Sequence, residues 1–136
     1  MNLIALTEEE AAIVAAFQRS PECRRARLPY RLVWVSALLD CMTAARLGWA
    51  DLDLPALRAI LTDGMRWTIA RPPASPRLVA RELHAFVRWA ARALGHPHAA
   101  ACCAYLRSAR AATDIHRGVV PLRAETVASA SASNSC

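Results

Sequence analysis

The stretch SPRLVARELHAFVRWAARALG, from Ser75 to Gly95, decides the fold class of this chain. At roughly 100° per residue, its basic side chains gather within about 80° of one helical face, and apolar side chains lie opposite. The basic face consists of Arg77, Arg81, His84, Arg88 and Arg92, and the apolar face of Val79, Leu83, Phe86, Ala90 and Leu94. This pattern predicts an amphipathic helix that packs one side against a hydrophobic core.

The composition of the whole chain also favours helices. Alanine is the most abundant residue, only 4 of the 136 residues are glycine, and extended β-branched runs are absent. A chain of this length is long enough for one hydrophobic core and too short for a second core of appreciable size. We therefore predict an all-α fold, a compact bundle of about five helices. We expect a single domain over 1–117 and a disordered Ser/Ala-rich tail over 118–136, because the tail has too few apolar residues to offset its ordering entropy.

Local signals place the five expected helices along the chain. Thr7 and Glu10 form a capping box for the first helix, which a break at Ser20-Pro21-Glu22 ends. Pro29 has the position of an early-turn proline in the second helix, which we expect to be the central one. The first two expected helices span 8–19 and 29–47. The third begins at a cap formed by Asp51 or Asp53 and ends before Pro72-Pro73. The fourth is the stretch Ser75 to Gly95, and the fifth spans about 98–112 and runs antiparallel to the fourth.

Arginine supplies all 17 basic residues, and the chain carries a net charge of +6 with a pI near 9.7. Two interpretations are open: a GC-rich genome enriches arginine and alanine together, or the guanidinium groups form a selected surface. A positive protein attracts polyanions, acidic proteins and anionic membrane surfaces. Glu82 is the only acidic side chain on the amphipathic helix, so pairing within that helix does not absorb its charge.

A second basic cluster lies in the connection before the expected central helix. It consists of Arg24, Arg25, Arg27 and Arg31. We predict that this cluster and the basic face of the amphipathic helix are the binding residues of the protein. One continuous basic face would favour a polyanion as the ligand, whereas two separated patches would favour ordinary solvation.

The cysteines and histidines do not form a recurrent metal motif. The five cysteines are Cys23, Cys41, Cys102, Cys103 and Cys136. Their odd number, without a C-x-x-C pair or a secretory signal, favours reduced thiols in the cytoplasm. His98 and Cys102 are four residues apart and could face one ion beside His96 and Cys103, but adjacent cysteines among alanines match no recurrent zinc spacing. We expect no metal and no other cofactor.

Several classes of function lack their motifs. The chain has no G-x-S-x-G, no Gly-rich phosphate loop and no paired carboxylates, so we expect no enzyme. A helix-turn-helix pattern fits Ala91, Leu94 and Gly95, but the helix that follows offers alanines and cysteines, which read no base edges. The most apolar stretch, Leu32 to Leu47, carries charged residues and is too short to span a bilayer, so we expect no membrane insertion.

A resemblance covers about residues 11–106 in loose pattern. The residues that carry it are Ala12, Ala15, Ala16, Phe17 and Ser20-Pro21-Glu22, then Leu57, Ile60 and Leu61, then Glu82, Leu83, Phe86, Val87 and Ala90. In this order they resemble small, uncharacterised all-helical proteins of GC-rich bacteria. The resemblance implies an all-helical fold, and it implies no activity and no functional residue.

These observations predict a non-catalytic interaction protein, an adaptor or subunit. It would dock on an acidic protein surface through its arginine-rich helix face. The alternative is sequence-independent binding of nucleic acid through the same arginines, which would weaken steeply with salt. Both hypotheses depend on whether the two basic clusters lie together in the fold.

Overall fold

The computed structural model describes residues 6–29, 31–63 and 75–118. These residues form seven α-helices and one short 3-10 helix, without a strand among them. The helices are α1 (Glu8–Gln18), α2 (Pro21–Ala26), α3 (Val33–Ala44), η1 (Trp49–Asp51), α4 (Leu54–Thr62), α5 (Pro76–Ala93), α6 (Ala99–Leu106) and α7 (Ala109–Gly118). The predicted all-α class is confirmed, and the predicted number of about five helices is wrong.

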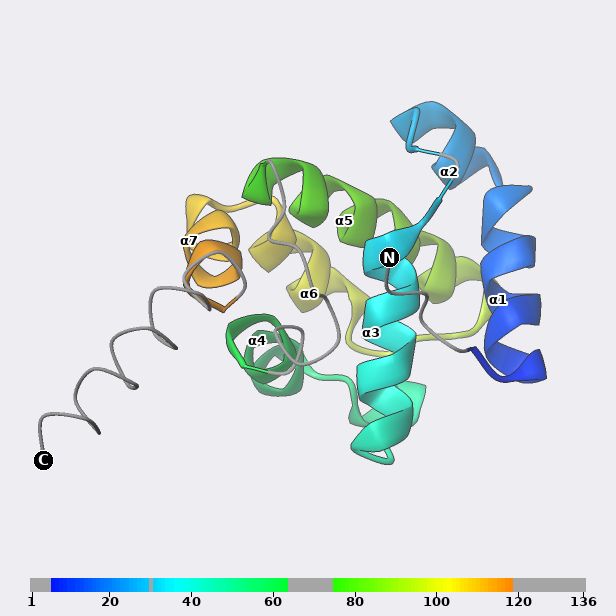
Figure 1. Ribbon diagram of the computed structural model, residues 1–136, viewed down its shortest axis with the longest axis horizontal. Helices are drawn as coiled ribbons and strands as arrows, with labels where there is room; N and C mark the ends of the chain where they lie inside the picture. Colours follow the sequence, from blue (N-terminus) through cyan, green and yellow to red (C-terminus); the bar gives the residue numbers. More distant parts are fainter. Residues whose placement is uncertain (1–5, 30, 64–74, 119–136) are drawn as a thin grey trace, which may run out of the picture.

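Helix α5 is the centre of the fold. It is the longest helix, with 18 residues, and it packs against α2, α3, α6 and α7. Figure 1 shows α5 running behind α3, with α6 returning antiparallel beside it, α7 and α4 on one side and α1 and α2 on the other. The prediction that the 29–47 helix is central is therefore wrong. In the described part of the chain, no helix has the length and apolar character needed to cross a membrane.

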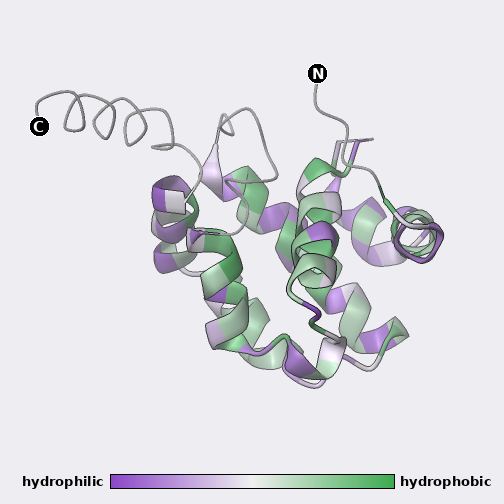
Figure 2. Ribbon diagram, turned by 60° about the horizontal axis from the view of Figure 1, so that its bottom comes forward, coloured by the Kyte–Doolittle hydropathy of each residue, from purple (hydrophilic) through white to green (hydrophobic). Residues whose placement is uncertain are grey.

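Aromatic rings join α1 to α5 in the core. The Phe17 ring meets the Phe86 ring edge to face, with centroids 5.2 Å apart, and Trp89 stacks on Phe86 at 5.6 Å. All three side chains are buried, and such pairs add to the stability that burial provides. Figure 2 shows that α4 is mostly hydrophobic, whereas hydrophilic residues are frequent along α7.

Several predicted helix ends are confirmed. The Thr7 hydroxyl accepts from the Glu10 N–H and the Glu10 carboxylate from the Thr7 N–H, both at 3.1 Å, which completes the capping box of α1. Of the two aspartates proposed as caps, Asp53 caps α4 by accepting from the Ala56 N–H at 2.9 Å. Gly95 follows α5 with a φ of +67°, a conformation that glycine adopts without strain. On the apolar face of α5, Leu94 alone is exposed.

The break expected at Ser20-Pro21-Glu22 is also the start of a helix, α2. Ser20 accepts from the Cys23 N–H at 3.2 Å and donates to the Phe17 carbonyl at 2.6 Å. Pro21 then occupies the first helical position, where its missing N–H has no cost. Pro29 does not open a helix, because α3 begins only at Val33 and ends at Ala44. The predicted helix over 29–47 is therefore too long at both ends.

The N-terminus of α3 is capped from α5 rather than by its own residues. Leu32, at the N-cap position, provides no side-chain hydrogen bond. Instead, the Val35 N–H donates to Glu82 Oε2 at 2.8 Å, and the Glu82 side chain is only 2% exposed. Burial raises the pKa of Glu82 to about 7, although hydrogen bonds from the Val35 and Trp34 N–H groups oppose the shift. One carboxylate thus satisfies helix donors 47 residues away in the sequence.

The expected fifth helix, over 98–112, is divided at Ser108 into α6 and α7. The Ser108 hydroxyl donates to the Tyr105 carbonyl at 2.6 Å and accepts from the Ala111 N–H at 3.4 Å. Helix α7 continues to Gly118, which is buried against the Leu61 carbonyl of α4. Helix α7 thus extends one residue beyond the domain boundary expected after residue 117. The tail expected over 119–136 lies outside the described residues.

A buried carboxylate holds α4, α6 and α7 together. Asp114 accepts from the Tyr105 hydroxyl at 2.6 Å and from Arg58 Nε at 3.3 Å, and Arg110 Nε lies 3.4 Å from its other oxygen. These partners lower the pKa of Asp114 despite its burial. Because its charge is matched within the fold, Asp114 is a structural residue rather than a ligand site.

We predict that Glu82→Gln removes a pH-dependent part of the stability. The pKa of Glu82 is about 7 in the folded protein and 4.5 in the unfolded chain, so the folded state holds the extra proton between these values. The free energy of unfolding of the natural protein should therefore fall as pH rises through this window, by up to about 3 kcal/mol relative to Glu82→Gln. Urea unfolding at pH 5, 6, 7 and 8 measures this difference. The exposed control Glu9→Gln should keep the pH dependence of the natural protein. If the free energies of unfolding of Glu82→Gln and of the natural protein changed in parallel with pH, the prediction would be contradicted.

We predict that Gly118→Ala destabilises the protein by about 1–3 kcal/mol. A Cβ atom at Gly118 would overlap the Leu61 carbonyl oxygen and press on the Thr62 backbone, neither of which is a flexible side-chain end. Thermal unfolding should show the loss, whereas Ala112→Gly, in the same helix, should cost only the usual helix-propensity difference of about 1 kcal/mol. An unchanged midpoint for Gly118→Ala would mean that α7 does not approach α4 as described.

Candidate anion-binding surface

The basic face of α5 is exposed. Arg77, Arg81, Arg88 and Arg92 are exposed and His84 is half-buried, while the opposite face of the helix is buried. This arrangement follows from the amphipathic pattern, since the apolar face packs against α3 and the helices around it. What the sequence could not predict is which elements border the basic face.

Helix α2 borders one side of this face. Arg92 makes two hydrogen bonds to the Glu22 carboxylate, Nε at 2.9 Å and Nη2 at 2.7 Å. The bond from Arg92 lowers the pKa of Glu22 to about 2. Nearer the start of α5, Arg81 Nη2 donates to the Ala26 carbonyl. These contacts hold α2 along the arginine row at two points.

Helix α6 and the turn after it border the other side. Burial lowers the pKa of His84, and the charges of Arg88 and Arg107 lower it further. The charges of the same two arginines oppose the rise that burial causes in the pKa of Cys103 of α6. The charge of Arg88 also contributes to the lowered pKa of Glu22 of α2. Arg88 therefore lies between α2 and α6, and Arg107 extends the basic face beyond α5. Arg107 was missing from the predicted binding residues because only the turn at Ser108 brings it there.

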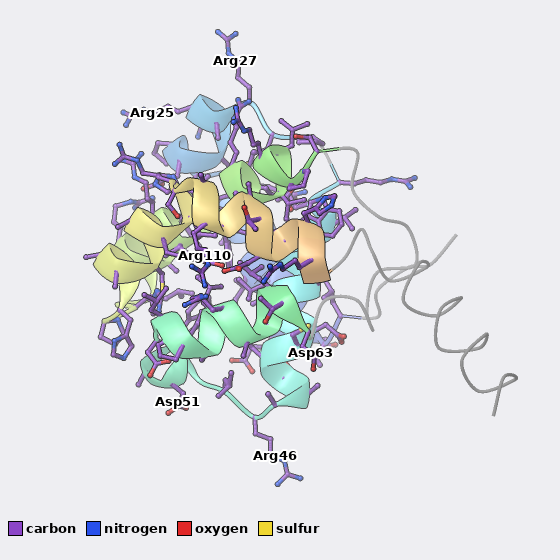
Figure 3. The ribbon with its side chains drawn as sticks, turned by 90° about the vertical axis from the view of Figure 1, so that its left-hand side faces the viewer. Arg25, Arg27, Arg46, Asp51, Asp63 and Arg110 are labelled. Atoms are coloured by element: carbon purple, nitrogen blue, oxygen red, sulfur yellow. The ribbon has the colours of Figure 1, made fainter. Side chains whose placement is uncertain are left out.

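The second basic cluster lies mainly on α2. Arg25 and Arg27 project away from the body of the protein (Figure 3), and Arg24 Nη2 donates to the Arg19 carbonyl at 2.7 Å. Arg27 lines one groove together with Arg81, so the two clusters meet. Arg31 is exposed just before α3. We use the name arginine surface for Arg24, Arg25 and Arg27, for Arg77, Arg81, Arg88 and Arg92, and for Arg107.

A groove of about 440 Å³ opens between α5 and the α6–α7 turn. Arg77, Arg81, His84 and Arg107 line it, together with small apolar residues such as Ala80. No acidic side chain of the described chain is among its lining residues. We call it the α5–α7 groove. Within the described ranges, Arg77, Arg88 and Arg107 form no ion pair, so these guanidinium groups are open to an external anion.

The suspected metal ligands have a different role. His96 Nε2 bonds to the Leu52 carbonyl at 2.8 Å, and His98 Nε2 bonds to the Ala50 carbonyl at 2.9 Å. The Cys102 thiol donates to the Leu52 carbonyl at 3.7 Å. Since a carbonyl only accepts, each Nε2 carries a proton and is not available to a metal. The three side chains hold the segment around η1 against the start of α6, and the described residues contain no cluster of three or more His, Cys, Asp or Glu side chains that could hold a metal ion.

The helix-turn-helix interpretation also lacks support in the geometry. Helix α6 buries Cys102, Tyr105 and Leu106, and its exposed positions are alanines. It packs along α5 as one member of an antiparallel pair rather than as a separate reading helix. Sequence-specific contacts to base edges need polar side chains that this helix does not present.

Comparisons with protein-family models, curated proteins and solved structures found no match to the chain. The resemblance to small all-helical proteins of GC-rich bacteria therefore stays a prediction.

We predict that zinc does not stabilise the protein. Burial raises the pKa of Cys102 to about 11, so this thiol stays protonated, and the His98 ring is held by a carbonyl. A metal that bound the folded state would raise the unfolding temperature. Thermal unfolding with equimolar zinc and with chelator should therefore give the same midpoint. A rise that chelator reverses and that His98→Ala abolishes would contradict this account.

Proposed function

We propose that this protein is a non-catalytic interaction protein that binds an acidic segment of a partner protein through the arginine surface. One observation carries the proposal: α2 packs along α5, so that two arginine clusters distant in the sequence adjoin. The resulting surface has more guanidinium groups than the fold itself neutralises. Glu22 is the one carboxylate paired with it in the described residues.

Charge supports an acidic partner. The net charge of +6 attracts negative proteins over a range that salt limits to about 10 Å at 0.1 M. Guanidinium groups bind carboxylates in a planar, two-bonded geometry, as Arg92 does with Glu22. Arg25, Arg77 and Arg88 have no such partner within the part of the chain that is described. An acidic segment would provide those partners.

Apolar residues beside the arginines favour a protein partner. A second groove, of about 520 Å³, lies between the α2–α3 connection and α5, and Arg27 and Arg81 line it. Its other lining residues include Leu28, Trp34 and Leu78, and Leu78 is 57% exposed. A segment with both acidic and apolar side chains would match this mixture. Phosphate backbones, by contrast, are bound mainly through charge.

Sequence-independent binding of nucleic acid is the second candidate function. The continuity of the arginine surface across α2, α5 and the α6–α7 turn favours it, because a charged backbone contacts a row of cations. Its affinity would depend steeply on salt and little on sequence.

We also propose that the protein has no catalytic activity and lies in the cytoplasm. Asp114 and Tyr105 are buried and hydrogen-bond to each other at 2.6 Å, and neither of them lines either of the two grooves beside the arginine surface. The four cysteines in the described ranges are free thiols, which suits a reducing compartment.

We predict that Arg25→Glu together with Arg88→Glu weakens binding to poly-L-glutamate at least tenfold. Both residues belong to the arginine surface and neither makes a described bond within the fold, so the variant should remain folded. Arg81 is unsuitable for this test because it holds α2. At low salt, fluorescence anisotropy should show at least a tenfold loss of affinity, since each lost charge-assisted bond is worth about 1.5 kcal/mol or more.

The matched control is Arg46→Glu together with Arg117→Glu. It changes the net charge equally, and Arg46 points away from the protein at the end opposite Arg25 and Arg27 (Figure 3). The control should keep most of the affinity. An equal loss in both variants would mean that only net charge matters, which contradicts a defined surface. Binding of single-stranded or duplex DNA without binding of poly-L-glutamate would favour the second candidate function.

A further inference from the structure

We propose that the α5–α7 groove is a binding site for a phosphate monoester. The site shares arginines with the surface to which we assign the docking of an acidic segment, and it differs in the ligand: a single dianionic group on a small organic molecule or side chain. Three arginines from two separate parts of the chain line this one groove, Arg77 and Arg81 from α5 and Arg107 from the α6–α7 turn.

The charge of the groove matches a dianion. A phosphate monoester carries about −1.5 to −2 charges near neutral pH and has three terminal oxygens that accept hydrogen bonds. A carboxylate has one charge and two oxygens, so it would leave part of the positive charge unmatched. The groove has no acidic lining residue in the described chain that would repel the phosphate or occupy the arginines.

The arginines differ in how they are held. Arg81 lies between the two sides: one of its N–H groups donates to the Ala26 carbonyl of α2, which orients the guanidinium group, and its other N–H groups stay open. Arg77 and Arg107 are exposed and have no ion pair among the residues described, so they can close on a ligand from two sides. One oriented and two adjustable cations suit a tetrahedral anion, whose oxygens point in different directions.

His84 adds a hydrogen-bonding group without a fixed charge. It is half-buried in the groove, and its pKa is lowered by burial and by the charges of Arg88 and Arg107. Its imidazole is therefore neutral near pH 7.5, and the charge of the site comes from the arginines. The first turn of α7 also borders the groove through Ala109 and Ala112, and the partial positive charge of a helix start adds to the attraction.

The size of the groove indicates an organic phosphate rather than the inorganic ion. Its volume of about 440 Å³ is within the range of small-ligand sites, far above the space that one phosphate group needs. Ala80, Leu106 and Ala112 provide apolar wall beside the arginines. This wall would cover the carbon part of the ligand while the guanidinium groups hold the phosphate.

The test compares phenyl phosphate with benzoate, which share a ring and differ in the anionic group. Isothermal titration calorimetry at pH 7.5 and fixed ionic strength should show phenyl phosphate binding at least tenfold more tightly. Equal affinity, or no binding of phenyl phosphate, would overturn the proposal. An acetylated phosphoserine pentapeptide is titrated as well: tighter binding of the peptide assigns the site to a phosphorylated protein, and tighter binding of phenyl phosphate assigns it to a free small molecule.

Two pairs of variants separate this site from the docking surface. Arg77→Gln with Arg107→Gln should reduce phenyl phosphate binding at least tenfold, with an unchanged unfolding temperature because neither side chain has a described partner. Arg25→Gln with Arg88→Gln should keep phenyl phosphate binding within about threefold, since neither residue lines the groove, and should weaken binding of poly-L-glutamate. Unchanged phenyl phosphate binding in the first pair would overturn the phosphate site. If the natural protein and both variants failed to bind poly-L-glutamate while the natural protein bound phenyl phosphate, the docking function would be overturned and the phosphate site would stand.

Discussion

The carboxylate of Glu82 at the N-terminus of α3 determines how α5 is oriented in the molecule. Burying a carboxyl group costs free energy unless hydrogen-bond donors compensate for the lost water. Here the N–H groups at the start of α3 are those donors. Since Glu82 points at α3 and the apolar face of α5 lies against the core, both constraints favour the same rotation of the helix. That rotation directs Phe86 into the core and leaves the row of arginines outside, between α2 and α6.

The arginine surface depends on a second, weaker constraint, the position of α2. The Arg92–Glu22 pair and the Arg81 bond to Ala26 are exposed, and exposed ion pairs usually contribute under about 1 kcal/mol each. Packing of α2 against α5 provides the rest. Without α2, the row on α5 would be an ordinary solvated helix face. With α2 beside it and Arg107 across from it, the row becomes the floor of a surface bordered by two grooves.

Local signals in the sequence predicted much of the fold. The capping box at Thr7, the cap at Asp53 and the glycine that follows α5 depend on neighbouring residues alone, and all three are present, whereas Ser75 makes no side-chain cap bond at the start of α5. Tertiary features were not predictable in this way. In the sequence, Glu82 is a lone acidic residue on a basic helix, but in the structure it is buried against α3. Gly118 lies at the start of a polar tail in the sequence, but in the structure it packs against the backbone of α4. The continuity of the arginine surface, and the place of Arg107 in it, likewise required knowing where α2 and the Ser108 turn lie.

The central claim is that arginines from three parts of the chain act as one anion-binding surface. The most direct measurement is a titration of the isotopically labelled protein with an acidic peptide, followed by ¹H–¹⁵N NMR of the arginine Nε–H groups. The account predicts that the Nε signals of Arg25 on α2, Arg88 on α5 and Arg107 after α6 shift together with one midpoint, while that of Arg46 stays in place. Shifts confined to one helix, or midpoints that differ between α2 and α5, would contradict it.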